Sequence, residues 1–382
     1  MRPPPRFATS SSYVRQGEPL LLRLAGLSWL TPFLVSLLLC AGLALTPAQT
    51  EAAYAATELA SLPVGSSRVV RAANDDGDIV GFARRGGGRG HRGFLLKSGP
   101  LQEIAGLPGS DYSVAFGVNN LGRVVGSANT ATAIRAFRSQ RTTGIVALVP
   151  LPGDSGSVAL GINDPGQAVG YSSGPNGVRA VIWTPAGAIQ ALPMLSGCDS
   201  ARGLAINDLG DIAGVCDTVS GPRAVLWEGG AVQDLGTLFG DRSSEALSIN
   251  ANGVIVGSSG DREAQHHAVL WPSGGGPIQD LGTLPDGRSS RALEINTRRE
   301  VVGISEARAG DHAFLWTEQD GMQDLNGLLT SRVGFVLTQA VAISAQGVIV
   351  AIGVDEATSA DQRHDHDDHE LPLRIFRLVP VP

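Results

Sequence analysis

The sequence predicts an all-β protein, a seven-bladed β-propeller with four short antiparallel strands in each blade. One motif of about 44–48 residues recurs seven times, a period typical of propeller blades. The chain has 382 residues and 50 glycines, nearly double the usual share, without the period of collagen. After an N-terminal apolar run, no segment keeps helical periodicity over the ~10 residues that a helix needs. Short strands joined by tight turns account for all three observations.

Three sub-patterns recur in the same order within the repeats. An apolar stretch ends in Asn before a glycine turn, as in "GLAINDLGDIAG" at 203–214. A basic residue then precedes an apolar run ending in Trp, as in "HAFLW" at 312–316, and "QDLGTL" follows, as at 233–238. Because the three patterns keep order and phase together, a chance origin is excluded. The Asn column consists of Asn74, Asn119, Asn163, Asn207, Asn250 and Asn296, with Ser344 in the seventh copy.

Each repeat contains four candidate strands, which we name a to d. Strand a ends at the Asn, strand b is the following Val/Ile/Gly stretch, strand c ends at the Trp, and strand d is the Asp-Leu-Gly-Thr-Leu stretch. The Asn side chain can bond the backbone two residues on, and the glycine accepts positive φ, so this turn closes an a–b hairpin. Arg299 replaces that glycine in the sixth copy, where we expect strain or a different turn. Ala351 replaces the second glycine in the seventh copy.

The two ends of the repeat region predict how the ring closes. The segment "ELASLP" at 58–63 matches the strand d segment "DLGTLP" at 280–285, yet no strand c precedes it. The last repeat ends after its strand c, at 373–378, without a strand d. Pairing of residues near 58–62 with residues near 374–378 would complete the seventh blade. A closed ring removes the open sheet edges that invite aggregation.

Residues 1–48 are interpreted as a signal peptide. Four arginines precede an apolar run at 24–45, and small residues follow at 46–48 and again at 53–55. We expect cleavage near 48 or 55. The run of about 22 residues is long enough to span a bilayer, so an uncleaved anchor is the alternative. Residues 56–382 are predicted to form a single repeat domain, and we expect a monomer.

Charge and compartment restrict the partners. The formal net charge is −7, and the repeat region has no basic stripe, which excludes nucleic acid as a partner. The signal segment predicts an exported protein that is periplasmic, secreted or held at the cell surface. It would contact a membrane only through the N-terminal segment, if that segment is not cleaved.

The blocks "HAFLW", "QDLGTL" and "INxxGxxxG" resemble the HAF-repeat family of probable extracellular bacterial proteins, named for its His-Ala-Phe tripeptide. The resemblance covers roughly 58–378 and is strongest in copies four to six. The literal tripeptide occurs only at 312–314, since five copies have Arg at the His position. The resemblance implies a secreted repeat protein without a defined biochemical role, and it implies no catalytic residues.

Two columns recur around the predicted ring. The basic column is interpreted as mostly structural, because a feature present in every repeat usually serves the repeat; a ring of positive charge for an anion is the alternative. The Trp column, which ends strand c, is interpreted as packing between sheets, with sugar stacking as the alternative. The basic column consists of Arg92, Arg135, Arg179, Arg223, His267, His312 and Arg374.

Cys198 and Cys216 are predicted to form a disulfide. Cys198 lies nine residues before Asn207 and Cys216 nine residues after it, so the two ends of the a–b hairpin should lie close together. An exported chain favours the bond. Cys40 would leave with the signal peptide.

The segment "HDHDDHE" at 364–370 is the one histidine cluster, with His364, His366 and His369 as candidate ligands of a divalent metal. A solvated charged run is the alternative, and no other cofactor is expected. The sequence contains no Gly-x-Ser-x-Gly, His-Glu-x-x-His or P-loop motif, so we assign no catalytic residue.

The leading functional hypothesis is a secreted, non-catalytic binding or scaffold protein whose ligand is an unknown extracellular protein or glycan. Recognition is expected on the b–c loops, which vary most between copies. The alternatives are a propeller-type hydrolase or lyase with a site at the channel mouth, and a purely structural surface protein. The b–c loops are 82–91, 127–134, 171–178, 215–222, 258–266, 304–311 and 352–373.

Overall fold

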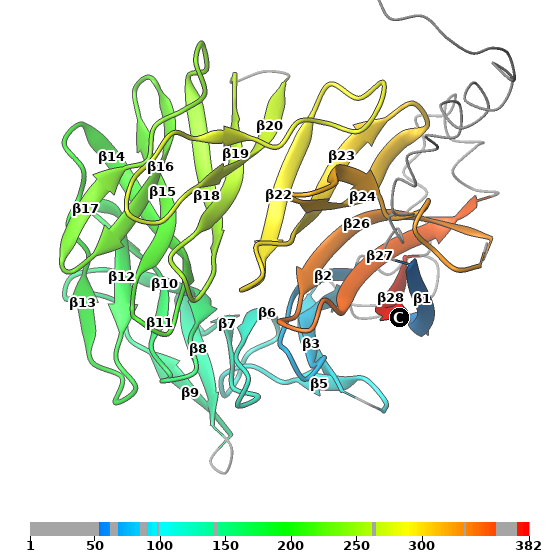
Figure 1. Ribbon diagram of the computed structural model, residues 1–382. Helices are drawn as coiled ribbons and strands as arrows, with labels where there is room; N and C mark the ends of the chain where they lie inside the picture. The colour runs from blue at the N-terminus through cyan, green and yellow to red at the C-terminus, as the bar shows by residue number, and fades with distance from the viewer. Residues whose placement is uncertain are drawn as a thin grey trace, which may run out of the picture. The chain divides into compact units, whose positions relative to one another are not determined.

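The computed structural model describes residues 53–61, 68–84, 90–97, 99–140, 144–261, 265–331, 334–356 and 373–381. They form seven four-stranded antiparallel sheets arranged in a ring, a seven-bladed β-propeller (Figure 1). In six sheets the spatial order of the strands follows their order in the chain. The predicted fold class is therefore confirmed.

Blades 1 to 3 follow one another directly along the chain. Their strands are β2 (Arg68–Ala73), β3 (Ile79–Arg84), β4 (His91–Leu96) and β5 (Gln102–Ile104); β6 (Ser113–Val118), β7 (Val124–Asn129), β8 (Ile134–Gln140) and β9 (Gly144–Leu148); and β10 (Gly156–Ile162), β11 (Ala168–Gly174), β12 (Gly177–Trp183) and β13 (Ile189–Ala191).

Blades 4 to 7 complete the ring. Their strands are β14 (Cys198–Ile206), β15 (Ile212–Thr218), β16 (Gly221–Glu228) and β17 (Ala231–Asp234); β18 (Ser243–Ile249), β19 (Ile255–Gly260), β20 (His266–Trp271) and β21 (Gln279–Asp280); β22 (Ser290–Ile295), β23 (Val301–Ala307), β24 (Gly310–Thr317) and β25 (Gly321–Asp324); and β26 (Phe335–Ile343), β27 (Ile349–Asp355), β28 (Arg374–Val381) and the N-terminal β1 (Ala53–Ser61).

Strand β1 closes the ring as predicted. It pairs with β28 in antiparallel register, with Glu58 opposite Phe376 and Ser61 opposite Arg374. The pairing extends further toward the N-terminus than the match to strand d indicated, because β1 already begins at Ala53. There the side chain of Tyr54 is 2% exposed, and its backbone accepts from Thr330 and donates to Leu328. The seventh blade therefore joins both ends of the described chain.

The core lies between the blades. Each of the seven buried apolar clusters contains residues of two or more neighbouring sheets; Trp183 of blade 3, for example, packs with Val125, Ala136 and Leu148 of blade 2. The four tryptophans of the column are between 0% and 4% exposed. They pack between sheets, and a sugar-stacking surface at these positions is excluded. The column consists of Trp183, Trp227, Trp271 and Trp316.

A β-bulge near the end of strand a explains why the residue seven after the Asn, in strand b, is glycine in six blades. In blade 3 the register shifts between Ala159 and Gly161, which brings the carbonyl of Val158 close to strand b. A Cβ on Gly170 would lie 2.0 Å from that oxygen, so only glycine fits. In the seventh blade, where Ala351 takes this place, β26 carries an additional register shift between Leu337 and Gln339.

Two expectations about turns have different outcomes. Arg299 has a φ of 64°, the left-handed conformation that glycine adopts in the other copies, so the expected strain is present. The prediction of irregular b–c loops at 171–178, 215–222 and 304–311 is wrong. Strands b and c extend into these ranges and leave two-residue turns at 175–176, 219–220 and 308–309. These short hairpins lack the length of a variable recognition loop.

Candidate binding channel

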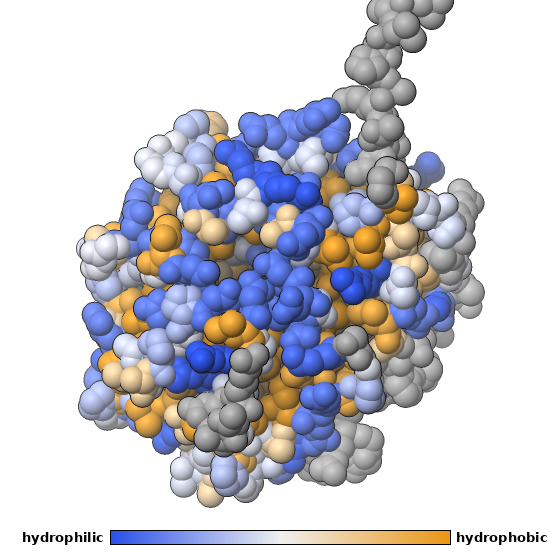
Figure 2. All heavy atoms as spheres, turned by 60° about the horizontal axis from the view of Figure 1, so that its bottom comes forward, coloured by the Kyte–Doolittle hydropathy of each residue, from blue (hydrophilic) through white to orange (hydrophobic). Residues whose placement is uncertain are grey.

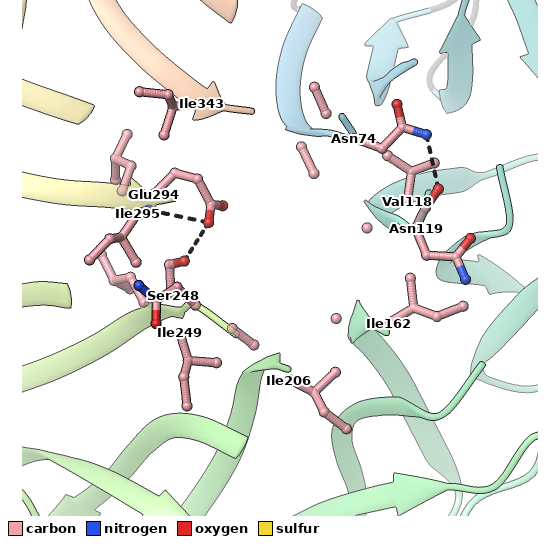
Figure 3. Close-up of a pocket in the computed structure, with 18 of the residues that line it drawn as sticks. Asn74, Val118, Asn119, Ile162, Ile206, Ser248, Ile249, Glu294, Ile295 and Ile343 are labelled. Atoms are coloured by element: carbon pink, nitrogen blue, oxygen red, sulfur yellow. Dashed lines mark hydrogen bonds between the residues drawn. The ribbon is translucent and has the colours of Figure 1, made fainter. Parts of the chain in front are cut away.

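The seven inner strands enclose a central cavity of about 590 Å³ (Figure 3). It is lined by strand a of every blade, namely β2, β6, β10, β14, β18, β22 and β26. Strand a is thus innermost, and residues from all seven repeats face one another across the cavity. We call this cavity the channel and take it as the candidate functional site.

One end of the channel is bounded by a belt of asparagine side chains. In each of the first six blades, Oδ1 of the Asn accepts a hydrogen bond from a backbone N–H of its own a–b turn. In blade 1, for example, the backbone N–H of Asp78 donates to Oδ1 of Asn74 at 2.7 Å. Nδ2 donates to the backbone carbonyl of the equivalent residue in the next blade. These links are Asn74 to Asn119, 2.9 Å; Asn119 to Asn163, 2.8 Å; Asn163 to Asn207, 3.0 Å; Asn207 to Asn250, 3.3 Å; Asn250 to Asn296, 2.9 Å; and Asn296 to Ser344, 3.0 Å.

A carboxylate closes the belt between blades 7 and 1. Oδ1 of Asp75 accepts from the backbone of Ala345 at 2.8 Å. The same position carries Asn120 and Asp164 in the next two blades, and their side chains accept from the backbone of the preceding blade at 2.9 and 2.8 Å. The acidic residues at this end therefore connect blades. The segment "NDDGD" at 74–78 forms such a turn, in which the backbone of Asn74 donates to Asp78 and accepts from Gly77.

Small and apolar side chains form most of the channel wall. The residue before the Asn is isoleucine in five blades, and the residue three before it is leucine in four (Figure 3). Such a ring of aliphatic side chains offers dispersion contacts to a ligand in the middle of the channel. The isoleucines are Ile162, Ile206, Ile249, Ile295 and Ile343, and the leucines are Leu160, Leu204, Leu247 and Leu293.

Glu294 is a charged exception in this wall. It lies two residues before the Asn of blade 6, at a position that holds Ala, Gly or Ser in every other blade. Its Oε1 accepts from Oγ of Ser248 at 2.5 Å and from the backbone of Ile295 at 3.3 Å. Burial raises the pKa of Glu294 to about 7, and the negative charge of Asp75 acts in the same direction. A carboxyl group with this pKa can both hold and release a proton at neutral pH.

The other end of the channel carries arginines. Arg71 and Arg291 line the cavity, on β2 and β22 respectively. Arg291 is paired with Glu245. Arg202, at the position equivalent to Arg291 in blade 4, is paired with Asp217 at 2.7 Å. The channel is therefore polar at both ends and largely apolar between them.

The basic column lies on strand c, and none of its seven residues lines the channel. Five of them face an acidic residue of strand d. The pairs are Arg92 with Glu103, 3.5 Å; Arg223 with Asp234, 3.7 Å; His267 with Asp280, 2.9 Å; His312 with Asp324, 2.7 Å; and Arg374 with Glu58 of β1.

The other two members of the column contact the loop at 149–155, which joins blades 2 and 3. Arg179 binds Asp154 at 2.9 Å, and Arg135 donates to the carbonyl of Ser155. In blade 6 the hydrogen bond that His312 donates to the carboxylate of Asp324 raises the pKa of His312. These contacts tie strand c to strand d and to the d–a loops, outside the channel.

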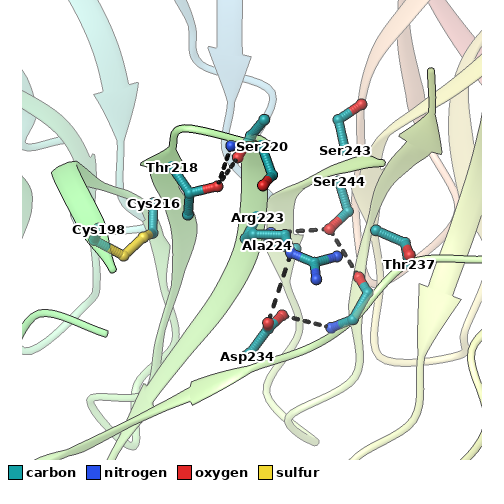
Figure 4. Close-up of polar contacts among 12 residues, drawn as sticks. Cys198, Cys216, Thr218, Ser220, Arg223, Ala224, Asp234, Thr237, Ser243 and Ser244 are labelled. Carbon is teal, nitrogen blue, oxygen red and sulfur yellow. Dashed lines mark hydrogen bonds and ion pairs between the residues drawn. A yellow bond between two sulfur atoms is a disulfide. The ribbon is translucent and has the colours of Figure 1, made fainter. Parts of the chain in front are cut away.

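Cys198 and Cys216 form the predicted disulfide, with their Cα atoms 5.7 Å apart (Figure 4). It joins strands a and b of blade 4. In blades 3 and 5 the equivalent positions hold an Asp and a Ser that form a hydrogen bond, Ser172 to Asp154 at 2.6 Å and Ser259 to Asp241 at 2.7 Å. The disulfide therefore replaces a hydrogen bond that the neighbouring blades use at the same place.

The candidate metal ligands His364, His366 and His369 lie outside the described residues, as do residues 1–48 of the expected signal peptide. Within the described part of the chain, no group of three or more His, Cys, Asp or Glu side chains is placed to hold a metal ion. A search of the same residues finds no helix with the length and apolar character of a membrane span.

Sequence reasoning missed Glu294 and Arg71 as exceptions to the repeat. Both were visible as departures from their columns: Glu294 stands among small residues, and Arg71 stands where the other copies have Phe116, Val341 or a leucine. Which columns face the channel depends on the bulge before the Asn.

Comparisons with known proteins support the fold. No protein-family model matches the sequence, and no curated protein matches it. Among solved structures, the chain is similar to a prolyl endopeptidase with a TM-score of 0.51 and 10% identity, covering 76% of this chain and 47% of that one. A virginiamycin B lyase from Staphylococcus aureus gives a TM-score of 0.46 and 12% identity, with 86% and 99% covered.

TolB from Acinetobacter baumannii gives a TM-score of 0.46 and 10% identity, with 65% of this chain and 63% of that chain covered. The chain thus spans less than two thirds of the endopeptidase and TolB chains. At 10% identity the similarity to the prolyl endopeptidase supports the fold alone.

Proposed function

We propose that this is an exported, non-catalytic binding protein whose ligand, from an extracellular protein or glycan, enters the central channel. The observation that carries the proposal is where the repeats differ. Around the ring the Asn belt, the basic column and the Trp column repeat a single structural scheme, whereas Arg71, Phe116 and Glu294 break it, and all three line the channel. A binding site on a symmetric frame requires such asymmetry, because a ligand rarely shares the sevenfold repeat.

The disulfide supports the exported location. Stable disulfides form in oxidising compartments and are rare in the cytosol, and Cys198–Cys216 joins two strands of a blade that is otherwise like its neighbours. On the face in Figure 2, hydrophilic and hydrophobic side chains are interspersed, with hydrophilic ones gathered toward the middle.

The test is a binding screen of the full chain against glycans and secreted proteins, followed by blockage of the channel. Leu204→Trp places a large side chain in the wall of the channel, whereas Leu209→Trp, at a side chain 76% exposed on an a–b turn, adds the same bulk outside it. We expect a ligand that binds the wild type and the Leu209 variant but not the Leu204 variant. Binding that survives in both variants places the site elsewhere, and no binding by the wild type favours a purely structural role.

A second candidate function is a hydrolase or lyase that uses Glu294 as an acid–base group. The pKa of about 7 favours it, because a group that titrates near the working pH transfers protons most effectively. Turnover of a bound ligand by the wild type, lost in Glu294→Gln with binding retained, would establish it. Unchanged ligand after prolonged incubation with the wild type supports the binding role.

A further inference from the structure

We propose that the channel end formed by blades 1 to 3 binds a carboxylate attached to a six-membered ring, with Arg71 binding the carboxylate and the nearby aromatic side chains contacting the ring. The inference rests on the proposed function and names the class of its ligand. Its residues are those at which blades 1 to 3 differ from the rest of the ring.

Arg71 has no hydrogen-bond or ion-pair partner among the described residues. It lines the channel and is exposed there. Arg291, the other arginine of the channel wall, is by contrast paired with Glu245. A guanidinium has five N–H donors in a planar fork, which matches the two oxygens of a carboxylate. The donors of Arg71 are thus free for such a group.

Two aromatic rings hold this guanidinium in place. Cζ of Arg71 lies 5.5 Å from the ring centroid of Phe82 and 5.7 Å from that of Phe116. Phe82 is on strand b of the same blade, and Phe116 is on strand a of the next. A guanidinium between two rings is oriented before a ligand arrives, and less conformational entropy is lost on binding.

The aromatic cluster around Phe82 continues beyond the residues that line the channel. The ring of His91 packs edge-on against Phe82 at 5.1 Å and against Tyr112 at 5.9 Å. Tyr171 of blade 3 lies close enough to Tyr112 to raise its pKa through charge, after the larger effect of burial. The side-chain hydroxyls of Tyr112 and Tyr171 form no hydrogen bond with described residues. Flat faces and free phenol donors together suit a ring that carries hydroxyl groups or π electrons.

The rest of the channel restricts the charge of this ligand. Figure 3 shows Glu294 across the cavity from the end of β2, the strand that also carries Arg71. The protein around Arg71 removes part of the water from its guanidinium and lowers its pKa, so an anion there gains more than it would in open water. A second anionic group would lie toward Glu294 and Asp75 and be repelled. The site therefore selects ring acids with one carboxylate.

The experiment measures binding of four probes to the full chain by ligand-observed NMR and calorimetry. Galacturonate and benzoate represent a sugar acid and an aromatic acid, and galactose and benzyl alcohol are their neutral counterparts. We expect one acid of the pair to bind at least roughly tenfold more tightly than its neutral counterpart, because only the acid can accept both guanidinium bonds. The arm that binds identifies the ring class.

Variants then test the assigned residues. Arg71→Met keeps the apolar stem near Phe82 and Phe116 and should lower the affinity for the acid by roughly tenfold or more. Arg71→Lys should recover part of this loss of affinity. Arg242→Met removes an exposed arginine outside the channel and should leave affinity unchanged. Tyr112→Phe, which removes only a hydroxyl, provides a milder variant with the same expected direction.

Two results overturn the inference. One is that neither acid binds more tightly than its neutral counterpart, and the other is that acid binding is unchanged in both Arg71→Met and Tyr112→Phe. The proposed function survives either result if another ligand binds the wild type and is excluded by Leu204→Trp. Melting curves of each variant show whether a loss of binding comes from a loss of fold.

Discussion

The side-chain amide of Asn74 donates to the backbone carbonyl of Asn119, 2.9 Å away in the next blade. Its carbonyl oxygen at the same time accepts from Asp78 in its own turn. Only a side chain with both a donor and an acceptor can close a hairpin and hold the neighbouring blade. This double task explains why asparagine recurs in six of seven repeats, where Asp or Ser could have formed the turn alone.

Replacing Asn163 with Asp separates the two tasks. The carboxylate still accepts from Gly166 and Gln167 in the turn, but it cannot donate to Asn207. We expect a loss of about 1–3 kcal/mol in the free energy of unfolding, the cost of leaving a buried acceptor unpaired. Urea titration measures it. Asn252→Asp is the control, since this exposed side chain donates to Thr297 in the next blade, and equal losses in both variants would contradict a special role for the belt.

Arg299→Gly should stabilise the protein. Arg299 has a φ of 64° at the position that glycine fills in the six other copies of the turn. Relief of the strain is expected to raise the free energy of unfolding by about 0.5–1 kcal/mol. Arg299→Ala removes the same side chain but keeps a Cβ, so it should not show the gain. Equal thermal denaturation midpoints for the two variants would refute strain as the cause.

The disulfide can be exchanged for the polar pair of its neighbours. Cys198→Ala with Cys216→Ala should lower the free energy of unfolding by about 2–3 kcal/mol under oxidising conditions. Cys198→Asp with Cys216→Ser reproduces the Ser172–Asp154 arrangement of blade 3 and should recover about 1 kcal/mol of that loss. Chemical denaturation of the three proteins, with and without reductant, measures both effects. No recovery by the Asp/Ser pair would show that blade 4 cannot accept the neighbouring geometry.

The buried Tyr54 predicts where an exported chain can be cut. A form beginning at Gln49 keeps all of β1, whereas a form beginning at Ala56 lacks Tyr54 and its two backbone hydrogen bonds to the loop of blade 6. We expect the shorter form to be less stable by about 3 kcal/mol or more, from lost apolar burial and hydrogen bonding. Thermal denaturation of both forms tests this, and N-terminal sequencing of the exported protein should find a start before Ala53. Equal stability would mean that closure depends on residues 56–61 alone.

Glu294 should make stability depend on pH. Its pKa is about 7 in the folded protein and near 4.5 when unfolded, so between these values the folded state binds more protons than the unfolded state. Stability from this group is therefore full below pH 4.5, falls as the pH rises to 7, and stays reduced above it. The shift corresponds to at most about 3 kcal/mol.

Glu294→Gln removes this dependence. The variant should be more stable than the wild type at pH 8 and similar to it at pH 4, as measured by urea titration at both values. Ser248→Ala, which removes the hydroxyl that donates to the carboxylate, should shift the transition to higher pH. A constant difference between Glu294→Gln and the wild type across this range would contradict the titration.

The repeat phase was sufficient to predict the blade number and the closure by β1, because orphan strands at 58–63 and 373–378 identify each other by their place in the motif. The disulfide followed from the hairpin geometry around Asn207. The bond from Asn74 to Asn119 could not be predicted, since a turn motif specifies contacts within itself and not with a turn 45 residues away. The direction in which Glu294 points depends on a bulge, and one extra residue moves a side chain to the other face of a strand.

The pairing of β1 with β28 has a consequence for the order of synthesis. Arg374 binds Glu58 across a separation of 316 residues, so this contact can form only after nearly the entire chain has left the ribosome or the export channel. Until then the first six blades form an incomplete ring with two unpaired sheet edges. Contacts of such high sequence separation slow folding and prolong the exposure of those edges. Completion of the seventh blade is therefore the folding step at which this protein would depend on a chaperone.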